Sequence, residues 1–378
     1  MLLRDSQSTK RYTYYIIITI NQEAPMSWFN RTKKATLGID ISATTIKLLE
    51  LIKTGNSYQV AHFSIVSLPH DAASQKKIST AILADGIKRA LKEAGSSLKQ
   101  AVVAVAESAI MTKTISLPAS LTDDEMEEEL IMTADQYLPY SLDDLNFDFE
   151  VHGINKNNPE MVDVLLVASR RENVDDRIEA LSLAGLKATI VDVEGYAMEN
   201  AFSLLSTTFL SPNNAQTIAI VDIGSTMTSL IILYNGKVIY TRGQSIGGKQ
   251  LTEEIQRHYG LTYEDAGLAK KKGGLPDNYN ETILFPFQKS LIQQIQRSLQ
   301  SFTSSNTYRS LDGIILAGGG ASMPGIDQLI QSHLNMPVNT ANPFLNMSLS
   351  HHVNAQSLYK EAPSLMLACG LALRGFDA

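Results

Sequence analysis

Two stretches of the chain share one pattern of apolar and polar positions. In the later stretch an apolar, β-branched run at residues 217–221 enters the polar loop Asp222-Ile-Gly-Ser-Thr, and a second apolar run at residues 227–234 leaves it. The earlier stretch, residues 36–51, reads TLGIDISATTIKLLEL and repeats the order of strand, aspartate, Ser/Thr loop and strand. The pattern predicts two β-hairpins, each with an aspartate where its first strand ends.

Related elements follow each hairpin. In the first half the pattern predicts a third strand at residues 58–67, an amphipathic helix at 79–94 and a buried strand at 100–106. In the second half it predicts a third strand at residues 237–241 and, later, a buried strand at 312–316. A strand, helix and strand in this order indicate a βαβ unit, so each half is expected to be an α/β lobe.

The repetition predicts an α/β chain of two duplicated lobes with smaller segments between and around them. The expected segments are the first part of the first lobe at residues 26–114, an inserted α/β subdomain at 115–186, a connection with a helix returning to the first lobe at 187–216, the second lobe at 217–361, and an apolar helix packed between the lobes at 362–378.

The insertion opens with an acidic helix, for which Thr122 and Glu125 form a predicted capping box. Its expected elements are a helix at residues 122–138, strands at 146–152 and 162–168, and a helix at 170–183. The acidic helix is consistent with a solvated face or with a docking surface, and the sequence leaves both open.

The two aspartate loops carry groups suited to phosphate. Gly224 lets the backbone approach a ligand, the Ser-Thr pair after it offers donors, and Asp222 is suited to hold a hydrated cation. Lys47 lies seven residues after Asp40, so at strand periodicity its side chain points back toward the first loop. One such loop is ordinary hairpin chemistry. Two of them predict a phosphate chain held between two lobes.

Further candidate groups lie on helix starts and turns. Gly247 and Gly248 open a helix, and a strand leads into the glycine-rich turn at residues 317–321, which lets the backbone approach a flat or anionic ligand. Glu194 lies near the start of the helix at residues 192–205. It is equally consistent with a favourable helix-dipole interaction and with a role in orienting a water molecule.

Composition excludes several classes of partner and site. The 378 residues carry a net charge of −7 with no basic stripe, which argues against nucleic acid or an anionic membrane surface as the main partner. The single cysteine, Cys369, excludes an internal disulfide and a cysteine-cluster metal site. The cationic run at residues 270–272 is expected to face solvent at a helix C-terminus.

The N-terminal residues differ in composition from the rest. The apolar run at residues 12–20 is about half the length that a membrane span needs. Residues 1–25 are therefore expected to lie outside the natural fold as a non-native or disordered extension, with Met26 as the working start.

The two loops, the Gly-Gly helix start, the later glycine turn and the closing apolar helix together resemble the superfamily of actin, heat-shock and sugar-kinase ATPases. Within it the chain resembles the PilM family of type IV pilus assembly proteins, relatives of the division protein FtsA. The matching stretches run in order from about Met26 to the C-terminus: LGIDISATTIKLLEL, LPASLTDDEMEEEL, YLPY, VDVEGYAMENAF, VDIGSTMTSLIIL, NGKVIYTRGQSIGGKQLTEEI, EDAGLAKKKGGLP, LAGGGASMPGI, ANPF and ACGLALR.

The resemblance implies an actin-like fold, a ribonuclease-H-like duplication with an inserted subdomain, that binds Mg-ATP between its lobes. It places the first phosphate loop at Asp40, Ser42, Thr44, Thr45 and Lys47 and the second at Asp222, Gly224, Ser225, Thr226 and Thr228. It places nucleoside contacts at Gly247, Gly248, Lys249, Lys270, Gly318, Gly319, Gly320 and Pro324. It assigns Mg²⁺, through water, to Asp40 and Asp222, and a place near the metal-bound water to Glu194.

Two positions depart from the pattern that the resemblance implies. Ser42 stands where the first loop of relatives has glycine, which narrows the room for a γ-phosphate. Gly267 stands where related actin-like proteins often carry a glutamate that contacts the ribose. Both departures favour slow or absent ATP hydrolysis.

The resemblance also implies partners. It implies a cytoplasmic scaffold, without nucleic-acid binding or direct membrane insertion, at the inner face of the bacterial inner membrane. The N-terminal tail of PilN would recruit it there, in a groove between the first lobe and the insertion. PilO and the pilus motor complex would be indirect partners, and the role would be pilus biogenesis and twitching motility. Self-association and a part in DNA uptake stay open.

Three functions are weighed on these observations. In the first, an ATP-binding scaffold, ATP closes the lobes and sets the orientation of the insertion, which selects partners. The alternative is an actin-like ATPase or filament-forming protein of the FtsA type, with turnover that Asp222→Ala abolishes. A sugar or acyl kinase is the third, but it needs an aspartate base facing a substrate pocket, and the second half shows no obvious candidate.

Overall fold

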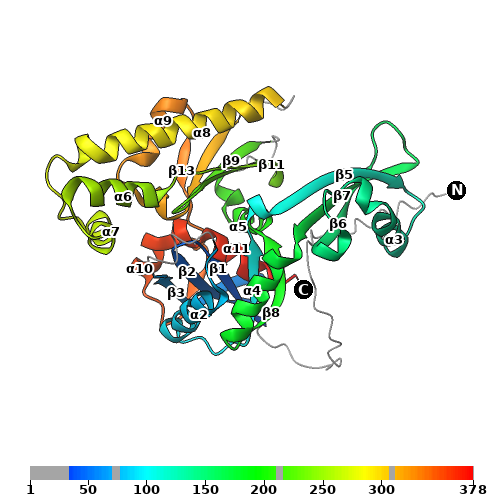
Figure 1. The fold of residues 1–378 in the computed structure, drawn as a ribbon, viewed down its shortest axis with the longest axis horizontal. Coiled ribbons are helices and arrows are strands. Elements are labelled where there is room, and N and C mark those ends of the chain that lie inside the picture. The colour runs from blue at the N-terminus through cyan, green and yellow to red at the C-terminus, as the bar shows by residue number, and fades with distance from the viewer. Residues whose placement is uncertain (1–33, 70–76, 210–215, 306–310, 378) are drawn as a thin grey trace.

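The computed structural model of the chain describes residues 34–69, 77–209, 216–305 and 311–377. Two lobes, each built on its own sheet, lie against each other, and a smaller third sheet projects from one side (Figure 1). The predictions for residues 1–25, for the apolar run at 12–20 and for the start at Met26 lie outside the described residues. No helix within the described ranges is both long and apolar enough to span a bilayer.

The first lobe is built on a six-stranded sheet with the predicted hairpin near its centre. In the order β14-β3-β2-β1-β4-β8 its strands are β1 (Lys34–Ile41), β2 (Thr45–Thr54), β3 (Ser57–Ser67), β4 (Gln100–Val105), β8 (Lys187–Val193) and β14 (Ser348–Leu349). β1 and β2 pair antiparallel with Asp40 opposite Lys47, whereas β4 runs parallel to β1. Helices α2 (Thr80–Ala94) and α4 (Arg171–Leu183) cover one face through side chains such as Leu83 and Val174.

The second lobe repeats this plan. In the order β11-β10-β9-β12-β13 its strands are β9 (Thr217–Ile223), β10 (Thr228–Tyr234), β11 (Lys237–Gln244), β12 (Gly313–Ala317) and β13 (Val338–Thr340). Again an antiparallel hairpin is followed by a strand parallel to its first member, here β12 beside β9. The predicted duplication of an α/β lobe is confirmed.

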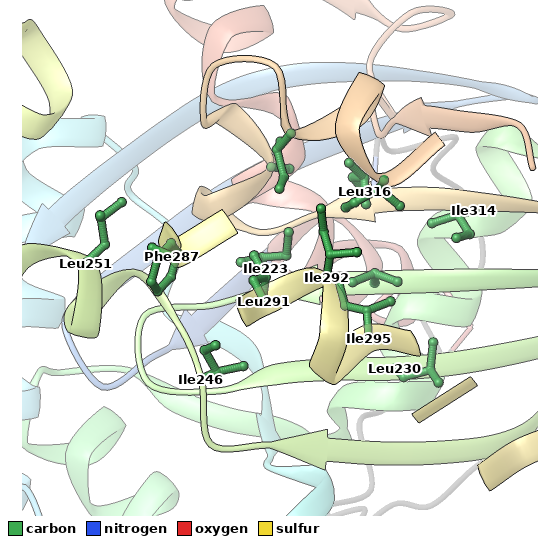
Figure 2. Close-up of a cluster of buried hydrophobic side chains, with 14 of the residues drawn as sticks. Ile223, Leu230, Ile246, Leu251, Phe287, Leu291, Ile292, Ile295, Ile314 and Leu316 are labelled. Atoms are coloured by element: carbon green, nitrogen blue, oxygen red, sulfur yellow. The ribbon is translucent and has the colours of Figure 1, made fainter. Parts of the chain in front are cut away.

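Four helices complete the second lobe. They are α6 (Gly248–Tyr259), α7 (Tyr263–Lys272), α8 (Phe285–Ser305), which follows a π-helical turn at Asn280–Leu284, and α9 (Ile326–Leu334). Figure 2 shows how α8 side chains such as Leu291 and Ile292 pack on Ile223 and Leu230 of the sheet. This core holds the ends of the strands in fixed positions relative to the starts of the helices.

Two helices separate the lobes. α5 (Glu194–Phe209) and α11 (Met366–Arg374) pack between the two sheets, and Met366 and Leu371 share a core with apolar residues from both. A Cβ atom at Gly370 would overlap the carbonyl oxygen of Ala197, so glycine is required where α11 crosses α5. The closing helix predicted at residues 362–378 begins as a 3-10 turn, Ala362–Leu365, after α10 (Ala355–Glu361).

The C-terminal part of the chain returns from the second lobe to the first. After β13, at the edge of the second-lobe sheet, it returns to the first lobe, where β14 pairs with β3 and α10 and α11 follow. The apolar face of β2 that α2 and α4 leave uncovered, including Leu49 and Leu51, packs against this C-terminal part. The first lobe is therefore made from both ends of the described chain.

The inserted subdomain has different bounds from those expected. Its sheet, in the order β5-β7-β6, consists of β5 (Ile110–Pro118), β6 (Leu145–Ile154) and β7 (Met161–Arg170), with α3 (Asp123–Thr133) packed on it. The subdomain thus begins before residue 115. It ends at Arg170, because α4 packs on the first lobe through Val174, Ala180 and Leu181.

The acidic helix of the insertion starts as predicted and stops early. The capping box is present, with the Thr122 N–H donating to Glu125 Oε2 (2.8 Å) and the Glu125 N–H donating to Thr122 Oγ1 (3.3 Å). α3 ends at Thr133, before the predicted end at residue 138, and a 3-10 turn follows it.

Candidate functional site

The first aspartate loop is closed on itself. The Ser42 N–H donates to the Thr45 carbonyl (3.0 Å), which shapes the tight loop through Thr44 between β1 and β2. Both oxygens of the buried Asp40 carboxylate accept hydrogen bonds, Oδ1 from Ser42 Oγ (2.8 Å) and Oδ2 from Lys47 Nζ (2.7 Å). Lys47 does turn back toward the loop as the sequence predicts, and there it pairs with the loop's own aspartate.

The second aspartate loop is fastened to the start of a helix. The Gly224 N–H donates to the Met227 carbonyl (2.9 Å) and closes the loop. The carbonyls of Gly224 and Ser225 accept from the N–H groups of Gly248 (3.0 Å) and Lys249 (2.7 Å), the first residues of α6. The loop and the α6 N-terminus therefore form one rigid unit.

The remaining residues of this unit differ in exposure. Thr226 is exposed at the tip of the loop, whereas Thr228 is buried and donates from Oγ1 to the Ile246 carbonyl (2.8 Å). A Cβ atom at Gly247 would lie 2.5 Å from the Ser225 carbonyl oxygen, so the close approach of loop and helix requires glycine there. Thr226 is thus suited to meet a ligand, while Thr228 and Gly247 shape the loop.

The glycine turn after β12 lies beside Asp222. β12 runs parallel to β9 with Ala317 opposite Asp222. Gly318 has a positive φ of 81° and buries its backbone against the carboxylate, where a Cβ atom would overlap Asp222 Oδ1. Gly320 is packed equally tightly on Ile223, but Gly319 is exposed with open space where its Cβ would be. The turn therefore presents bare backbone next to a carboxylate.

Three carboxylates, those of Asp40, Asp222 and Glu194, and the Lys47 ammonium group interact electrostatically where the two loops face each other. Burial and the charges of Asp40 and Asp222 raise the pKa of Glu194, at the start of α5, to about 8. Burial raises the pKa of Asp222 to about 6, against the effect of Lys47. Burial alone would lower the pKa of Lys47, but the two aspartates outweigh it and the pKa is raised. The excess of negative charge favours an additional cation here.

The structure also tests how a metal would be held. Among the described residues, no three acidic, histidine or cysteine side chains stand close enough to hold a metal ion by themselves. Both Asp40 oxygens already accept hydrogen bonds. A cation near Asp40 and Asp222 therefore fits only with oxygens from water or a ligand such as a phosphate.

Lys270 does not face solvent, contrary to the expectation for the cationic run. Its Nζ donates to the Gly248 carbonyl (2.8 Å) and to Thr252 Oγ1 (2.6 Å), which ties α7 to α6. Burial lowers the pKa of Lys270 to about 8. Two other residues predicted to contact the nucleoside lie on nearby elements. Lys249 Nζ lies 3.8 Å from Glu253 Oε1. The carbonyl of the exposed Pro324 accepts a hydrogen bond from Gln288 Nε2 (2.9 Å).

The structure adds a carboxylate that the sequence did not single out. Glu107, Glu194, Asp222 and Thr241 line one hollow of about 300 Å³ beside the loops. Thr241 Oγ1 donates to Glu107 Oε1 (2.6 Å) across a sequence separation of 134 residues. No local motif carries such a pair, so sequence periodicity gave no signal for it.

The chain is similar to known proteins in sequence and in structure. A family model described as type IV pilus assembly protein PilM matches residues 38–376. A solved PilM-PilN type IV pilus biogenesis complex is similar with a TM-score of 0.75 and 27% identity, covering 92% of this chain and 99% of that one. The ethanolamine utilization protein EutJ from Carboxydothermus hydrogenoformans has a similar fold, with a TM-score of 0.52 and 16% identity over 90% of each chain.

A curated relative matches over a shorter length. The cell division protein FtsA of Bacillus subtilis (strain 168) is 27% identical over a match that covers 33% of this chain and 34% of that protein. The chain therefore aligns with about a third of the length of this relative.

Proposed function

Since the chain belongs to the family of the type IV pilus assembly protein PilM and has its actin-like fold, we propose that it is an ATP-binding scaffold of the pilus assembly complex. It would work in the cytoplasm, at the inner face of the bacterial inner membrane. The observation that carries the nucleotide part is the meeting of two aspartate loops, one from each lobe, around Asp40 and Asp222.

The phosphates would lie between the loops. Ser42, Thr44, Thr45 and Lys47 would face them from the first lobe and Gly224, Ser225 and Thr226 from the second, where the buried Thr228 would shape the loop. Mg²⁺ would be held through water at Asp40 and Asp222, where the excess of carboxylates supports it. The nucleoside would lie along Gly247, Gly248, Lys249 and Lys270 and the turn formed by Gly318, Gly319, Gly320 and Pro324. Bound ATP would supply a hydrolysable phosphate bond and the charge that draws the lobes together.

Slow or absent hydrolysis is part of the proposal, and the protonation state of Glu194 bears on it. A general base must be ionised to take a proton from water, and a pKa of about 8 leaves the Glu194 carboxyl mostly protonated at neutral pH. A bound cation would lower this pKa, and in the loaded protein Glu194 would orient water. We take the raised pKa of Glu194 to outweigh the effect of a bound cation, which supports retention of ATP over rapid turnover.

The partner is proposed to be the N-terminal tail of PilN. A small, mainly apolar depression lies at the junction of the first lobe and the insertion, lined by Val105, Ile110 and Val174 and by Asn146, Phe147 and Asp148 of β6. The half-buried edge of β6 beside this depression offers both apolar and polar groups to an extended peptide. Its position supports the predicted groove, and PilO and the pilus motor complex would then be indirect partners.

One experiment separates the candidate functions. The full chain is loaded with γ-labelled ATP and magnesium, and bound nucleotide and released phosphate are followed together over hours. ATP retained intact supports the scaffold. Steady phosphate release that Asp222→Ala abolishes supports the FtsA-type ATPase or filament protein, an alternative that the partial FtsA match fits only weakly.

The control is Asp277→Ala, which removes an exposed carboxylate of the same lobe. It is expected to bind and retain ATP as the unmodified chain does. Failure of the unmodified chain to bind ATP at all would refute the nucleotide part of the proposal.

A further inference from the structure

Glu107 stands where the chain leaves the first lobe for the inserted subdomain. It begins a single 3-10 turn, η1 (Glu107–Ala109), between β4 of the first lobe and β5 of the subdomain. The Ala109 carbonyl at the end of η1 accepts from Ser169 Oγ (2.9 Å), one residue before β7 ends and the chain re-enters the first lobe. Both crossings of the chain therefore meet at η1.

The Glu107 side chain contacts the other two parts of the molecule. Its Oε1 accepts from Thr241 Oγ1 (2.6 Å) on β11 of the second lobe. Its Oε2 is buried against the backbone of Gly195, where a Cβ atom would lie 2.8 Å from it, and the Gly195 backbone stabilises the ionised form of the carboxyl group. Gly195 follows Glu194, and the charges of Asp40 and Asp222 raise the pKa of Glu194.

We propose that Glu107 is a positioning residue that couples occupancy of the phosphate site to the orientation of the inserted subdomain. The inference rests on the proposed function, because it requires ATP between the loops. One carboxylate reaches from the root of the subdomain to a strand of the second lobe and to the helix start that carries Glu194.

The physical argument is the cost of a buried carboxylate without donors. If the second lobe moves relative to α5, Thr241 moves with β11 and Glu107 loses the donor to Oε1. A buried, unsatisfied carboxylate is unfavourable, so the lost bond favours a movement of η1 that returns Glu107 to water. β5 follows η1 directly, so the subdomain is expected to move with it. The contact thus gives the subdomain two arrangements that lobe closure can select between.

The test measures subdomain orientation directly. Spin labels are placed on exposed positions of α2 and α3 through Lys88→Cys and Glu128→Cys, while the buried Cys369 stays unlabelled. Electron–electron double resonance then gives the distance distribution between first lobe and subdomain with and without ATP and magnesium. We expect ATP to shift this distribution in the otherwise unmodified chain.

Two variants remove the contact from opposite sides. Glu107→Leu and Thr241→Val are each expected to abolish the ATP-dependent shift, and the double variant to do no more than either single one. Glu160→Leu removes an exposed carboxylate of the same subdomain and is expected to leave the shift intact. Circular dichroism and ATP binding on each variant show that it is folded and loaded.

A second measurement uses a synthetic peptide of the PilN tail. The ratio of its Kd values with and without ATP is expected to differ from 1 by about fivefold or more and to fall to about 1 in both variants. A uniform loss of peptide affinity leaves this ratio unchanged, so a merely structural role does not imitate the result.

Two outcomes overturn the inference alone: an ATP-dependent shift that persists in Glu107→Leu and Thr241→Val, or ATP binding without any shift in the unmodified chain. Absence of ATP binding instead refutes the proposed function and, with it, this inference.

Discussion

Replacing Gly370 by alanine tests whether the two lobes are held by direct contact of helix backbones. In an ordinary helix interior this change is favourable by about 1 kcal/mol, because alanine is a better helix former than glycine. In α11 the added Cβ would overlap the Ala197 carbonyl oxygen of α5 and lie 2.5 Å from its carbon. The two effects have opposite signs, so the measurement decides between them.

The magnitude follows from the required movement. Real Cβ atoms essentially never come within 3.0 Å of such a neighbour, so the carbonyl carbon alone demands a shift of about 0.5 Å, from 2.5 Å to 3.0 Å, and the overlapping oxygen demands more. Both partners are backbone and cannot rotate away. Overpacking costs up to about 3 kcal/mol, and subtracting about 1 kcal/mol of helix propensity leaves a net loss of about 2 kcal/mol.

Thermal unfolding followed by circular dichroism measures the effect. At about 2 °C per kcal/mol for a large chain, Gly370→Ala is expected to lower the midpoint by about 4 °C. The matched control is Gly267→Ala in α7, where the nearest atom to an added Cβ is a methyl carbon at 3.8 Å and only the helix-propensity gain applies. A Gly370→Ala midpoint at or above that of the unmodified chain would refute the reasoning.

Two further predictions concern buried charge. Arg374 and Asp192 form an ion pair with side chains 1% and 0% exposed, so Arg374→Met should cost about 3–5 kcal/mol in urea unfolding by stranding the carboxylate, and the double variant with Asp192→Asn should recover part of it. Burial raises the pKa of Glu150 from 4.5 to about 7, so the folded chain keeps a proton that the unfolded chain releases, and stability falls as pH rises through this window. Glu150→Gln should flatten that fall in melting curves taken on either side of the window, and an unchanged pH profile would contradict the assignment.

Local patterns predicted the parts of the fold that local interactions determine. The two hairpins follow from runs of β-branched residues around short polar loops, and Ser79 and Gly95 cap α2 where the pattern placed its ends. The Thr122 capping box likewise depends only on neighbours within one turn. Family resemblance then supplied the arrangement of the lobes.

Contacts between segments that are far apart in the sequence could not be predicted from local patterns. Amphipathic helix α4 could pack on either neighbouring sheet, and only the folded chain shows Val174 in the first-lobe core. Lys270 is held by Gly248 and Thr252 on another helix, so its sequence neighbours suggested a solvated cation. Glu107 meets Thr241 across 134 residues and belongs to no repeated pattern.

The return of the chain from the second lobe to the first has a consequence for synthesis on the ribosome. β1 and β2 emerge early, but β14, α10 and α11, which cover their remaining apolar face, emerge last. The second-lobe sheet, by contrast, is drawn from one continuous stretch between β9 and β13. The lobe begun first is therefore completed only after the second-lobe sheet, and until α11 emerges its apolar face is open to chaperones or to other nascent chains.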